Sequence, residues 1–350
     1  MIRIAVDAMG GDYAPAVVIE GLTAALYDFP EYEITIVGHQ GKISLYLEKY
    51  GIADHPRVKL VHAEETVEMH EPATAVLRGK RNSSITVCAK LLRDKKVDAI
   101  FSAGHTGAMV AASTVLVRTL EGIQRPAIAT IMPGMYGKYI LLDSGANPDC
   151  DPINLVQFAL MGEAYAEFFF GMTEPRIGLL SVGEEDSKGN ELTKEAFKQL
   201  SRMPINFVGN VEGNTIFENI TEVVICDGFV GNILLKGCEG LSKSVSHWIK
   251  GVMAKNPVRL TGAMLARNAF KDLKSFADAE DIGGAPLLGI DGIVIIAHGS
   301  STPRAVRNGI KVSGEFVKFG INDKIINRVK ETGALASKSE SESELGNDKN

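Results

Sequence analysis

The feature that most constrains the fold of this chain is a repeated alternation of short apolar runs with longer segments of helical pattern. Apolar runs at residues 2–6, 33–37, 58–61 and 98–102 are each followed by a segment that is compatible with a helix. A strand, a helix and the next strand bury their apolar faces together when the strands are parallel. The sequence therefore predicts an α/β protein whose mixed, largely parallel sheet is flanked by helices.

Two further apolar runs indicate that the sheet is mixed. Residues 127–132 and 139–143 are separated only by the turn sequence PGMYGK, which predicts an antiparallel hairpin. After the hairpin the alternation resumes. We expect strands at 176–182, 205–208, 223–226 and 292–297, and helices at 153–170, 191–200 and about 303–319, besides a first helix with Pro15 in its first turn.

The composition is ordinary for a globular protein and argues against several classes of partner. The 350 residues are 45% hydrophobic and 23% charged, enough to bury a large core, and the net charge of −6 gives no support for nucleic-acid binding. No signal peptide and no apolar run of about 18 residues is evident, so we expect a cytoplasmic protein without a transmembrane helix. We expect one domain over residues 1–332 and a disordered polar tail over 333–350. The cysteines form no CxxC pair, which indicates reduced thiols: Cys88, Cys150, Cys226 and Cys238.

Common cofactor signatures are absent from the sequence. No two glycines are separated by a single residue, which rules out the GxGxxG fingerprint of dinucleotide-binding proteins. The segment Gly38–Lys42 is too short for a P-loop, and no HExxH or close carboxylate cluster suggests a metal. An enzyme that depends on a nicotinamide or on ATP therefore loses its simplest support.

Eight turns rich in glycine and asparagine follow predicted strands or lie close to them. Such residues tolerate positive φ and are common in any tight turn, but small residues also let backbone amides approach a ligand. In open α/β sheets, ligands bind at the carboxyl edge of the strands. The turns together predict a cleft for a compact anion or a polarised carbonyl. They are Asp7–Asp12, Ser102–Ala108, Asp143–Asn147, Gly183–Asn190, Gly209–Asn214, Asp227–Asn232, Gly283–Gly289 and His298–Ser301.

Taken together, these turns resemble one family, the bacterial phosphate acyltransferases. The resemblance covers about residues 2–330, with two departures: His105 stands where the family has Asn, and Ile282 where it has Tyr. The motifs that carry it are DAMGGD from Asp7, SAGHTGA from Ser102, LLDSGAN from Leu141, GEEDSKGN from Gly183, FVGNVEG from Phe207, DGFVGNILLK from Asp227, GGAPLLG from Gly283 and HGSS from His298.

The resemblance implies an activity and its partners. It implies a fold like that of isocitrate and isopropylmalate dehydrogenases, shared with phosphotransacetylases, and a homodimer. It also implies transfer of a fatty acyl group from acyl-[acyl-carrier-protein] to inorganic phosphate, without a cofactor. The acyl phosphate would then pass to a membrane glycerol-3-phosphate acyltransferase. A short-chain phosphotransacetylase that uses acyl-CoA is the nearest alternative, and a non-catalytic scaffold for lipid synthesis is another.

Phosphate is already an anionic nucleophile near neutral pH, so the site needs only to hold it, stabilise an oxyanion and assist the leaving thiolate. Asparagine side chains can donate to the oxyanion, although each could equally cap a helix, and Lys188 could equally be a surface ion-pair partner. The histidine could be an acid or base, or a structural residue. The catalytic candidates are Lys188, Asn190, Asn210, Asn232 and His298, and the substrate-binding candidates are Asp7, Gly10, Gly11, Asp12, Gly104, His105, Thr106, Gly107, Asn147, Asp227, Ser300 and Arg304.

One segment, about residues 243–276, differs in charge from the rest. Between Lys243 and Lys274 it has seven Lys or Arg and one acid, and apolar residues recur at helical spacing on both sides of Asn256-Pro257. Two basic amphipathic helices in a hairpin suit an anionic membrane surface, and predict peripheral membrane association. The same stripes could instead pack on the body or on a dimer mate, or the basic patch could bind an acidic carrier protein. The membrane candidates are Trp248, Ile249, Lys250 and Met253.

Overall fold

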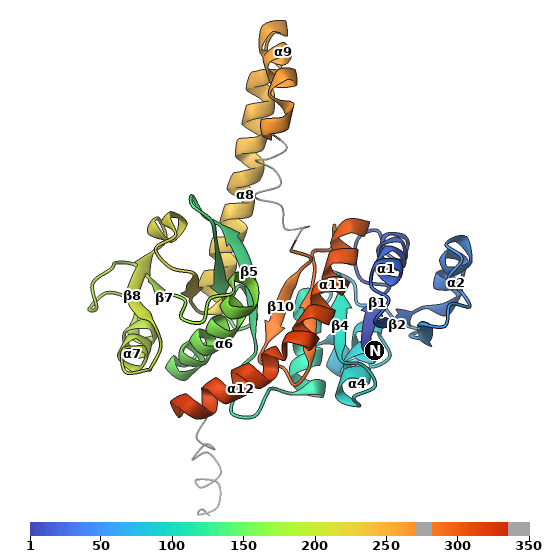
Figure 1. Cartoon of the computed structure of the whole chain (residues 1–350), viewed down its shortest axis with the longest axis horizontal. Helices are drawn as coiled ribbons and strands as arrows, with labels where there is room; N and C mark the ends of the chain where they lie inside the picture. The colour runs from blue at the N-terminus through green and yellow to red at the C-terminus, as the bar shows by residue number, and fades with distance from the viewer. Residues whose placement is uncertain (271–281, 335–350) are drawn as a thin grey trace, which may run out of the picture.

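The computed structural model describes residues 1–270 and 282–334 of the chain. One eleven-stranded sheet runs through the body of the molecule, in the order β3-β2-β1-β4-β11-β10-β5-β6-β9-β7-β8 (Figure 1). The strands are β1 Ile2–Asp7, β2 Tyr32–Gly38, β3 Val58–His62, β4 Ala99–Ser102, β5 Ala127–Pro133, β6 Lys138–Leu142, β7 Ile177–Ser181, β8 Phe207–Glu212, β9 Val223–Ile225, β10 Ala285–Leu288 and β11 Ile293–Ile296.

The direction of the strands reverses across the middle of the sheet. Strands β3, β2, β1, β4 and β11 are mutually parallel, and so are β6, β9, β7 and β8. Between these two sets lie three successive antiparallel pairings, β11–β10, β10–β5 and the predicted β5–β6 hairpin. Three reversals leave the two sets pointing in opposite directions. Their carboxyl ends therefore lie at opposite edges of the sheet, whereas the sequence had suggested a single edge.

Helices cover both faces of the sheet. Helices α1 and α11 share one hydrophobic cluster with β1, whereas α4 and α5 share the cluster on the opposite face. In the other half, α6, α7 and α12 extend the first cluster, and the root of α8 packs on a third. The helices are α1 Ala16–Asp28, α2 Gln40–Lys49, α3 Ala75–Arg78, α4 Ser84–Arg93, α5 Thr106–Ala112, α6 Pro152–Phe170, α7 Glu191–Leu200, α8 Gly228–Met253, α9 Pro257–Leu265, α11 Pro303–Phe319 and α12 Ile321–Thr332, with a π turn at Ser113–Val117 and a 3₁₀ turn at Thr215–Glu218.

Several helices and strands begin or end at other residues than the sequence predicts. The first helix begins at Ala16, and Pro15 precedes it as the N-cap. Strand β8 runs through residues 207–212, so the expected turn at 209–214 begins inside a strand. This edge strand tolerates Gly209 at φ +102 beside a register irregularity in its pairing with β7. Residues 285–288, expected as part of a turn, form β10.

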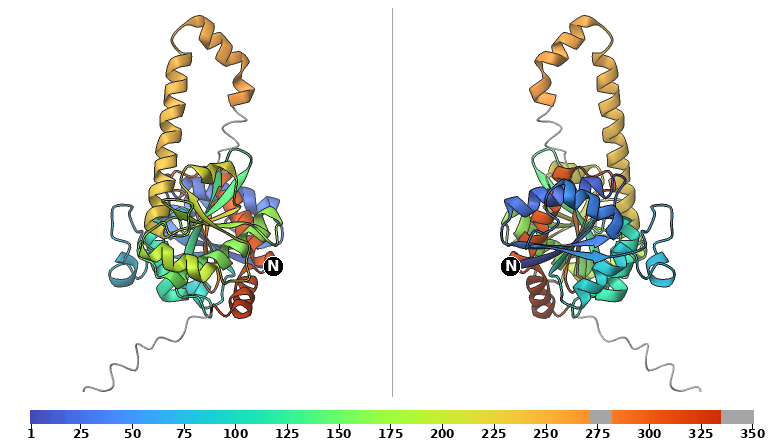
Figure 2. Two further views of the ribbon diagram at one scale, coloured as in Figure 1. Left: turned by 90° about the vertical axis from the view of Figure 1, so that its left-hand side faces the viewer. Right: turned by 90° about the vertical axis from the view of Figure 1, so that its right-hand side faces the viewer.

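Helix α8 leaves the body and projects away from it, and α9 folds back beside its far end (Figures 1 and 2). Its 26 residues correspond to a length of about 39 Å at 1.5 Å per residue. The helix is continuous from the Asp227 turn to Met253, so residues 243–253 of the basic segment form the outer part of α8, and α9 belongs to the same segment. The predicted break is confirmed: the Asn256 side chain accepts a hydrogen bond from Arg259 N at the start of α9.

Two expectations fall outside what the structure describes. Leu273 and Phe276 of the expected second apolar stripe lie in residues 271–281, and nearly all of the expected tail lies in 335–350. Among the described residues, no helix is both long and apolar enough to span a membrane.

Candidate active site

The first group of candidate residues lies where β1, β4 and β11 end. Asp7, the last residue of β1, is fully buried. Ser102 Oγ donates to its Oδ2 atom at 2.7 Å, and the backbone N–H of Met9 donates to Oδ1 at 3.1 Å. Ser102 Oγ in turn accepts from the backbone N–H of Gly104 at 3.1 Å. The carboxylate therefore ties the turn after β1 to the turn after β4.

Glycine is needed in this group because two turns pass very close to each other. A Cβ atom on Gly10 would lie 2.6 Å from both Asp7 Oδ2 and Gly104 N. Gly11 has φ +112, and the next residue, Asp12, donates its N–H to Gly299 O at 2.8 Å. Strand ends that are distant in sequence therefore meet. We call this group the Asp7 corner: Asp7, Gly10, Gly11, Asp12, Gly104 and His298–Ser300.

Burial affects the pKa of the carboxyl group at the centre of the Asp7 corner. It raises the pKa of the Asp7 carboxyl, and hydrogen bonds from the hydroxyls of Ser84 and Ser102 and the amides of Met9 and Gly10 oppose the rise.

The His298 side chain is exposed at the mouth of the Asp7 corner. Its Nδ1 atom accepts the backbone N–H of Ser300 at 3.2 Å and lies 2.8 Å from Ser300 Oγ. Because Nδ1 is an acceptor here, the neutral ring carries its proton on Nε2, which can donate to a ligand. The neighbouring candidate Arg304 is exposed in the first turn of α11.

The turn after β4 contributes backbone but not its histidine. His105 caps α5: its Nδ1 accepts from Ala108 N at 3.1 Å, and its Nε2 lies 3.0 Å from Glu71 O. Both ring nitrogens are thus engaged within the protein. Substrate binding by the His105 side chain stays a prediction and would require one of these contacts to break, whereas Thr106 and Gly107 form the first turn of α5.

A second group lies at the opposite edge, where β6 and β9 end. Its centre is Asp143, which is fully buried and follows β6 directly. The carboxylate accepts the backbone N–H groups of Ile128, Gly145, Ala146 and Asn147 at 2.8–3.1 Å, and Asn147 Nδ2 at 2.8 Å. Burial raises the pKa of Asp143, and these hydrogen bonds oppose the rise.

The root of α8 closes against Asp143. Asp227 caps the helix by accepting from Val230 N at 2.9 Å, and Gly228 N donates to Asn147 O at 2.8 Å. A Cβ atom on Gly231 would collide with Asp143 O. We call this group the Asp143 corner: Asp143–Asn147 and Asp227–Asn232.

The two asparagines of the Asp143 corner differ in the exposure and the hydrogen bonds of their side-chain amides. Asn147 is 7% exposed, and its Nδ2 donates to Pro126 O at 2.6 Å and to Asp143 Oδ2 at 2.8 Å. Both amide hydrogens are used within the protein, so substrate binding by Asn147 stays a prediction that would require one of these contacts to break. Asn232 is exposed and lies against Gly145, where a Cβ atom would be 3.4 Å from Asn232 Cβ. It remains a candidate donor.

Three further candidates lie near the ends of β7 and β8, on the edge that carries the Asp143 corner. Asn190 Oδ1 accepts from Thr193 N at 2.9 Å, so Asn190 acts as the N-cap of α7. Asn210 is 7% exposed within β8 and donates from Nδ2 to Glu185 O at 2.9 Å. Lys188 is exposed, in the loop between β7 and α7. Capping uses only the Oδ1 atom of Asn190, and Asn210 uses one of its two amide hydrogens, so donation to an oxyanion stays a prediction for both.

The structure thus divides the candidates into two sets. His298 and the glycines expected to bind phosphate belong to the Asp7 corner, and Lys188 and Asn232 belong to the other edge. The two edges are connected on one face of the sheet, because Ala146 packs against the hydrophobic cluster that includes Ala108 and Met109 of α5.

Asp143 is the residue that sequence reasoning missed. It has the same signal as Asp7, an acid directly after a buried strand and before a glycine turn, yet only Asp7 was singled out.

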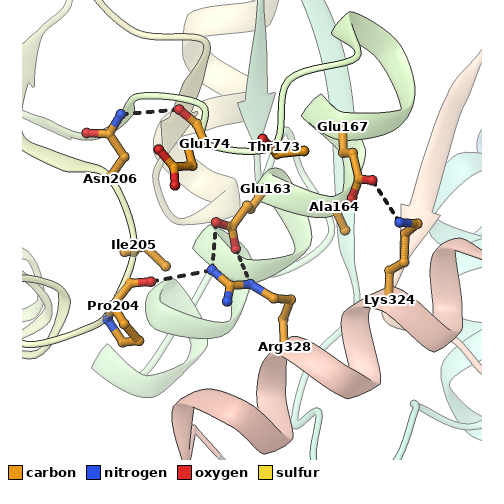
Figure 3. A pocket seen from close by; sticks show the side chains of 10 residues that line it. All are labelled: Glu163, Ala164, Glu167, Thr173, Glu174, Pro204, Ile205, Asn206, Lys324 and Arg328. Carbon is orange, nitrogen blue, oxygen red and sulfur yellow. Dashed lines mark hydrogen bonds and ion pairs between the residues drawn. The ribbon is translucent and has the colours of Figure 1, made fainter.

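A cavity of about 690 Å³ lies apart from these candidates, between α6 and α12 (Figure 3). Arg328 forms a two-pronged ion pair with Glu163, and Lys324 pairs with Glu167, each with contacts of 2.7 Å. The cations that line this cavity are therefore neutralised by carboxylates of the chain itself. Among the described residues, no three His, Cys, Asp or Glu side chains gather as metal ligands.

The fold is shared with a solved phosphotransacetylase. A phosphotransacetylase from Streptococcus pyogenes superposes with a TM-score of 0.57 at 17% identity, covering 94% of each chain. At that identity the likeness shows the fold alone, and it confirms the expectation of a phosphotransacetylase-like α/β fold.

Sequence comparison defines the family. Residues 2–324 match the family described as "Fatty acid synthesis protein". A phosphate acyltransferase of Nitratiruptor sp. is 45% identical over 95% of this chain and 98% of its own. One of Geobacter sulfurreducens is 44% identical over 94% of each chain. The chain therefore belongs to this family.

Proposed function

We propose that this protein is an acyltransferase that moves a fatty acyl group from acyl-[acyl-carrier-protein] to inorganic phosphate, and so makes acyl phosphate for phospholipid synthesis. The observation that carries the proposal is 45% identity to a phosphate acyltransferase along 95% of the chain. The Asp7 corner supports it, because its closely packed glycines let a compact anion approach the backbone.

The reaction needs no separate nucleophile from the protein. A phosphate oxygen attacks the thioester carbonyl, the new C–O bond forms, and the carbonyl oxygen takes up the negative charge. When the intermediate collapses, the C–S bond breaks and the thiolate leaves, taking a proton from a nearby donor or from water. The protein has to align the two substrates and to stabilise charge on the oxyanion and on the sulfur.

Each side of the sheet supplies groups for these tasks. In the Asp7 corner, the Gly10-Gly11 and Gly104 turns hold phosphate, and the Nε2–H of His298 donates to the developing charge. On the other edge, the exposed Asn232 amide and the Lys188 ammonium serve the oxyanion and the leaving sulfur. Arg304, at the mouth of the Asp7 corner, adds positive charge for phosphate.

A thioester cleavage assay tests the function. The purified protein should release free thiol from acyl-[acyl-carrier-protein] only when phosphate is added, with an equal yield of acyl phosphate. Faster cleavage of short-chain acyl-CoA would favour a phosphotransacetylase that uses coenzyme A. Absence of phosphate-dependent cleavage with either donor would contradict the enzyme and favour a scaffold.

We further infer that the protein is a homodimer joined through α8. Leu234, Cys238, Leu241 and Val245 follow the alternating four-and-three spacing of a helix-pairing stripe. Leu241 is 62% exposed and Val245 is 40% exposed, which supports a partner over the outer part of this stripe. Sedimentation should give a dimer for the wild type and a monomer for Val245→Glu. A dimer in that variant would contradict the inference, and Leu45→Glu on exposed α2 is the matched control.

We also infer that the far end of the α8–α9 projection binds an anionic membrane, which would bring the labile product close to a membrane glycerol-3-phosphate acyltransferase. Trp248 is 62% exposed, Val258 82% and Leu265 83%, and Lys250 is exposed near them. Ile249 and Met253 are half-buried, so they contribute less contact than expected. Apolar side chains with adjacent lysines suit the lipid headgroup region.

Flotation with phosphatidylglycerol vesicles tests the membrane inference. Trp248→Glu and Lys250→Glu should each lower the floated fraction, whereas Leu45→Glu should not. Equal flotation of both variants and the wild type would contradict the inference.

A further inference from the structure

The loop that carries Lys188 is attached to the body through one asparagine. We call Gly183–Gly189, between β7 and α7, the Lys188 loop. Its residues 184–188 are exposed. In the part of the chain that the structure describes, one hydrogen bond joins this loop to a neighbouring element: Asn210 Nδ2 of β8 donates to Glu185 O at 2.9 Å. The position of the loop therefore depends on the Asn210 amide.

The orientation of that amide is determined by the loop. Asn210 is 7% exposed, and its Oδ1 is buried without a hydrogen-bond partner among the described residues. A reversed amide would set Oδ1 against Glu185 O, oxygen against oxygen. Burying a polar atom without a partner costs free energy. The hydrogen bond from Asn210 Nδ2 to the Lys188 loop offsets the cost of burying Oδ1.

The bond from Asn210 leads directly to Lys188. Glu185 O accepts Asn210 Nδ2 and also the backbone N–H of Lys188, each at 2.9 Å. The Lys188 side chain then runs back over the end of β7, where a Cβ atom on Gly183 would lie 2.8 Å from Lys188 Cγ. Gly189, at φ +105, ends the loop in a conformation that favours glycine. One carbonyl oxygen thus links Asn210 to the backbone that positions the lysine.

We propose that Asn210 is a positioning residue for Lys188: it holds Glu185 O, and with it the Lys188 loop, so that the ammonium is in place for acyl transfer. The proposal rests on the role of Lys188 in the proposed function. It differs from the expectation that Asn210 donates to the oxyanion, and it uses the amide hydrogen that donates to the loop.

A double-mutant cycle separates positioning from general stabilisation. In the otherwise wild-type protein, Asn210→Ala should lower kcat/KM for phosphate about tenfold, a coupling of the size found for residues in one hydrogen-bond network. In a Lys188→Ala background the same substitution should change kcat/KM less than about twofold, because the lysine it positions is gone. Equal losses in both backgrounds, or wild-type kinetics in Asn210→Ala, would overturn the proposal.

A second variant keeps the test usable if Asn210→Ala does not fold. Asn210→Asp has nearly the same shape but can donate to Glu185 O only when its carboxyl is protonated. Its activity relative to wild type should rise as the pH falls, whereas that of Asn210→Ala should not. A flat ratio for Asn210→Asp would overturn the proposal.

Ser181→Ala is the matched control. Ser181 lies on β7 beside β8, and its Oγ is buried without a partner among the described residues. It should keep wild-type kinetics, and a loss equal to that of Asn210→Ala would assign the effect to the local packing and overturn the proposal. Wild-type activity in Lys188→Ala would contradict the role of the lysine in the proposed function and remove the basis of the inference, an outcome distinct from equal losses in the cycle.

Discussion

The Asp7 corner and the Asp143 corner are built on the same plan but held by different donors. Each has a fully buried aspartate at the end of a strand or directly after it, close to a glycine position where a Cβ atom would not fit. Asp7 is bonded by the hydroxyls of Ser84 and Ser102 and by the backbone amides of Met9 and Gly10. Asp143 is bonded by four backbone amides and the Asn147 side chain.

The two corners therefore differ in whether they can accommodate a change in the protonation state of their aspartate. A hydroxyl can rotate and either donate or accept, so the Asp7 corner can accommodate a carboxyl in either protonation state. Backbone amides only donate and are fixed in place, so the Asp143 corner requires an acceptor at that point. We therefore assign Asp143 to the attachment of α8, and the Asp7 corner to phosphate.

The largest effect is expected from removing the acceptor of the Asp143 corner. Asp143→Ala leaves at least four backbone amides and the Asn147 amide without their partner inside the protein. We expect a loss of about 3–5 kcal/mol in the free energy of unfolding, measured by urea denaturation. Ser144→Ala, which removes a neighbouring hydroxyl that does not contact the carboxylate, should cost about 1 kcal/mol. Similar losses in the two variants would contradict the assignment.

The next largest effect is expected where α8 meets Asp143. A Cβ atom on Gly231 would collide with Asp143 O, whereas one on Gly237 of the same helix would meet nothing within 4 Å. Gly231→Ala should therefore lower the free energy of unfolding by roughly 1–3 kcal/mol. Gly237→Ala should raise it by up to about 1 kcal/mol, because alanine favours a helix. If both substitutions stabilised the protein equally, the close approach at Gly231 would be wrong.

A smaller, pH-dependent effect is expected in the Asp7 corner. Burial raises the folded-state pKa of Asp7, so the folded state binds more protons than the unfolded state. Its contribution to stability is then present below the unfolded pKa, near 3.9, and is lost as the pH rises through the folded pKa. Asp7→Asn removes this titration. As the pH rises, the variant should therefore gain stability relative to the wild type, by about 1.4 kcal/mol for each unit by which the pKa of Asp7 is raised. Urea denaturation between pH 4 and 8 measures the difference, and a constant difference would contradict it.

Local features of the fold were predictable from the sequence. Helices α7 and α11 have the expected bounds, because a side-chain cap (Asn190 or Thr302) marks each start. The β5–β6 hairpin was visible in its turn residues. Strand β10 was not, because Gly283-Gly284 and Pro286 suggest a turn and its pairing with β5 is long-range.

The site was predictable only in part. The glycine turns were found, but strand direction is set by long-range pairing, so their division between two edges could not be read from local pattern. Whether a side-chain amide has a hydrogen-bond partner inside the protein also depends on residues that only the folded chain brings close. Asn147 and Asn210 look like Asn232 in sequence, and only the structure gives the first two buried partners.

The central claim is that groups from both edges of the sheet serve one transfer of an acyl group to phosphate. The most direct test is the rate of acyl phosphate formation in His298→Ala, Lys188→Ala and Asn232→Ala, each shown to be folded by circular dichroism. We predict that His298→Ala and at least one of the other two lose roughly 10²–10³-fold in kcat, the usual effect of removing a donor to a developing charge. Near-wild-type rates in all three, or losses confined to one edge, would contradict the claim.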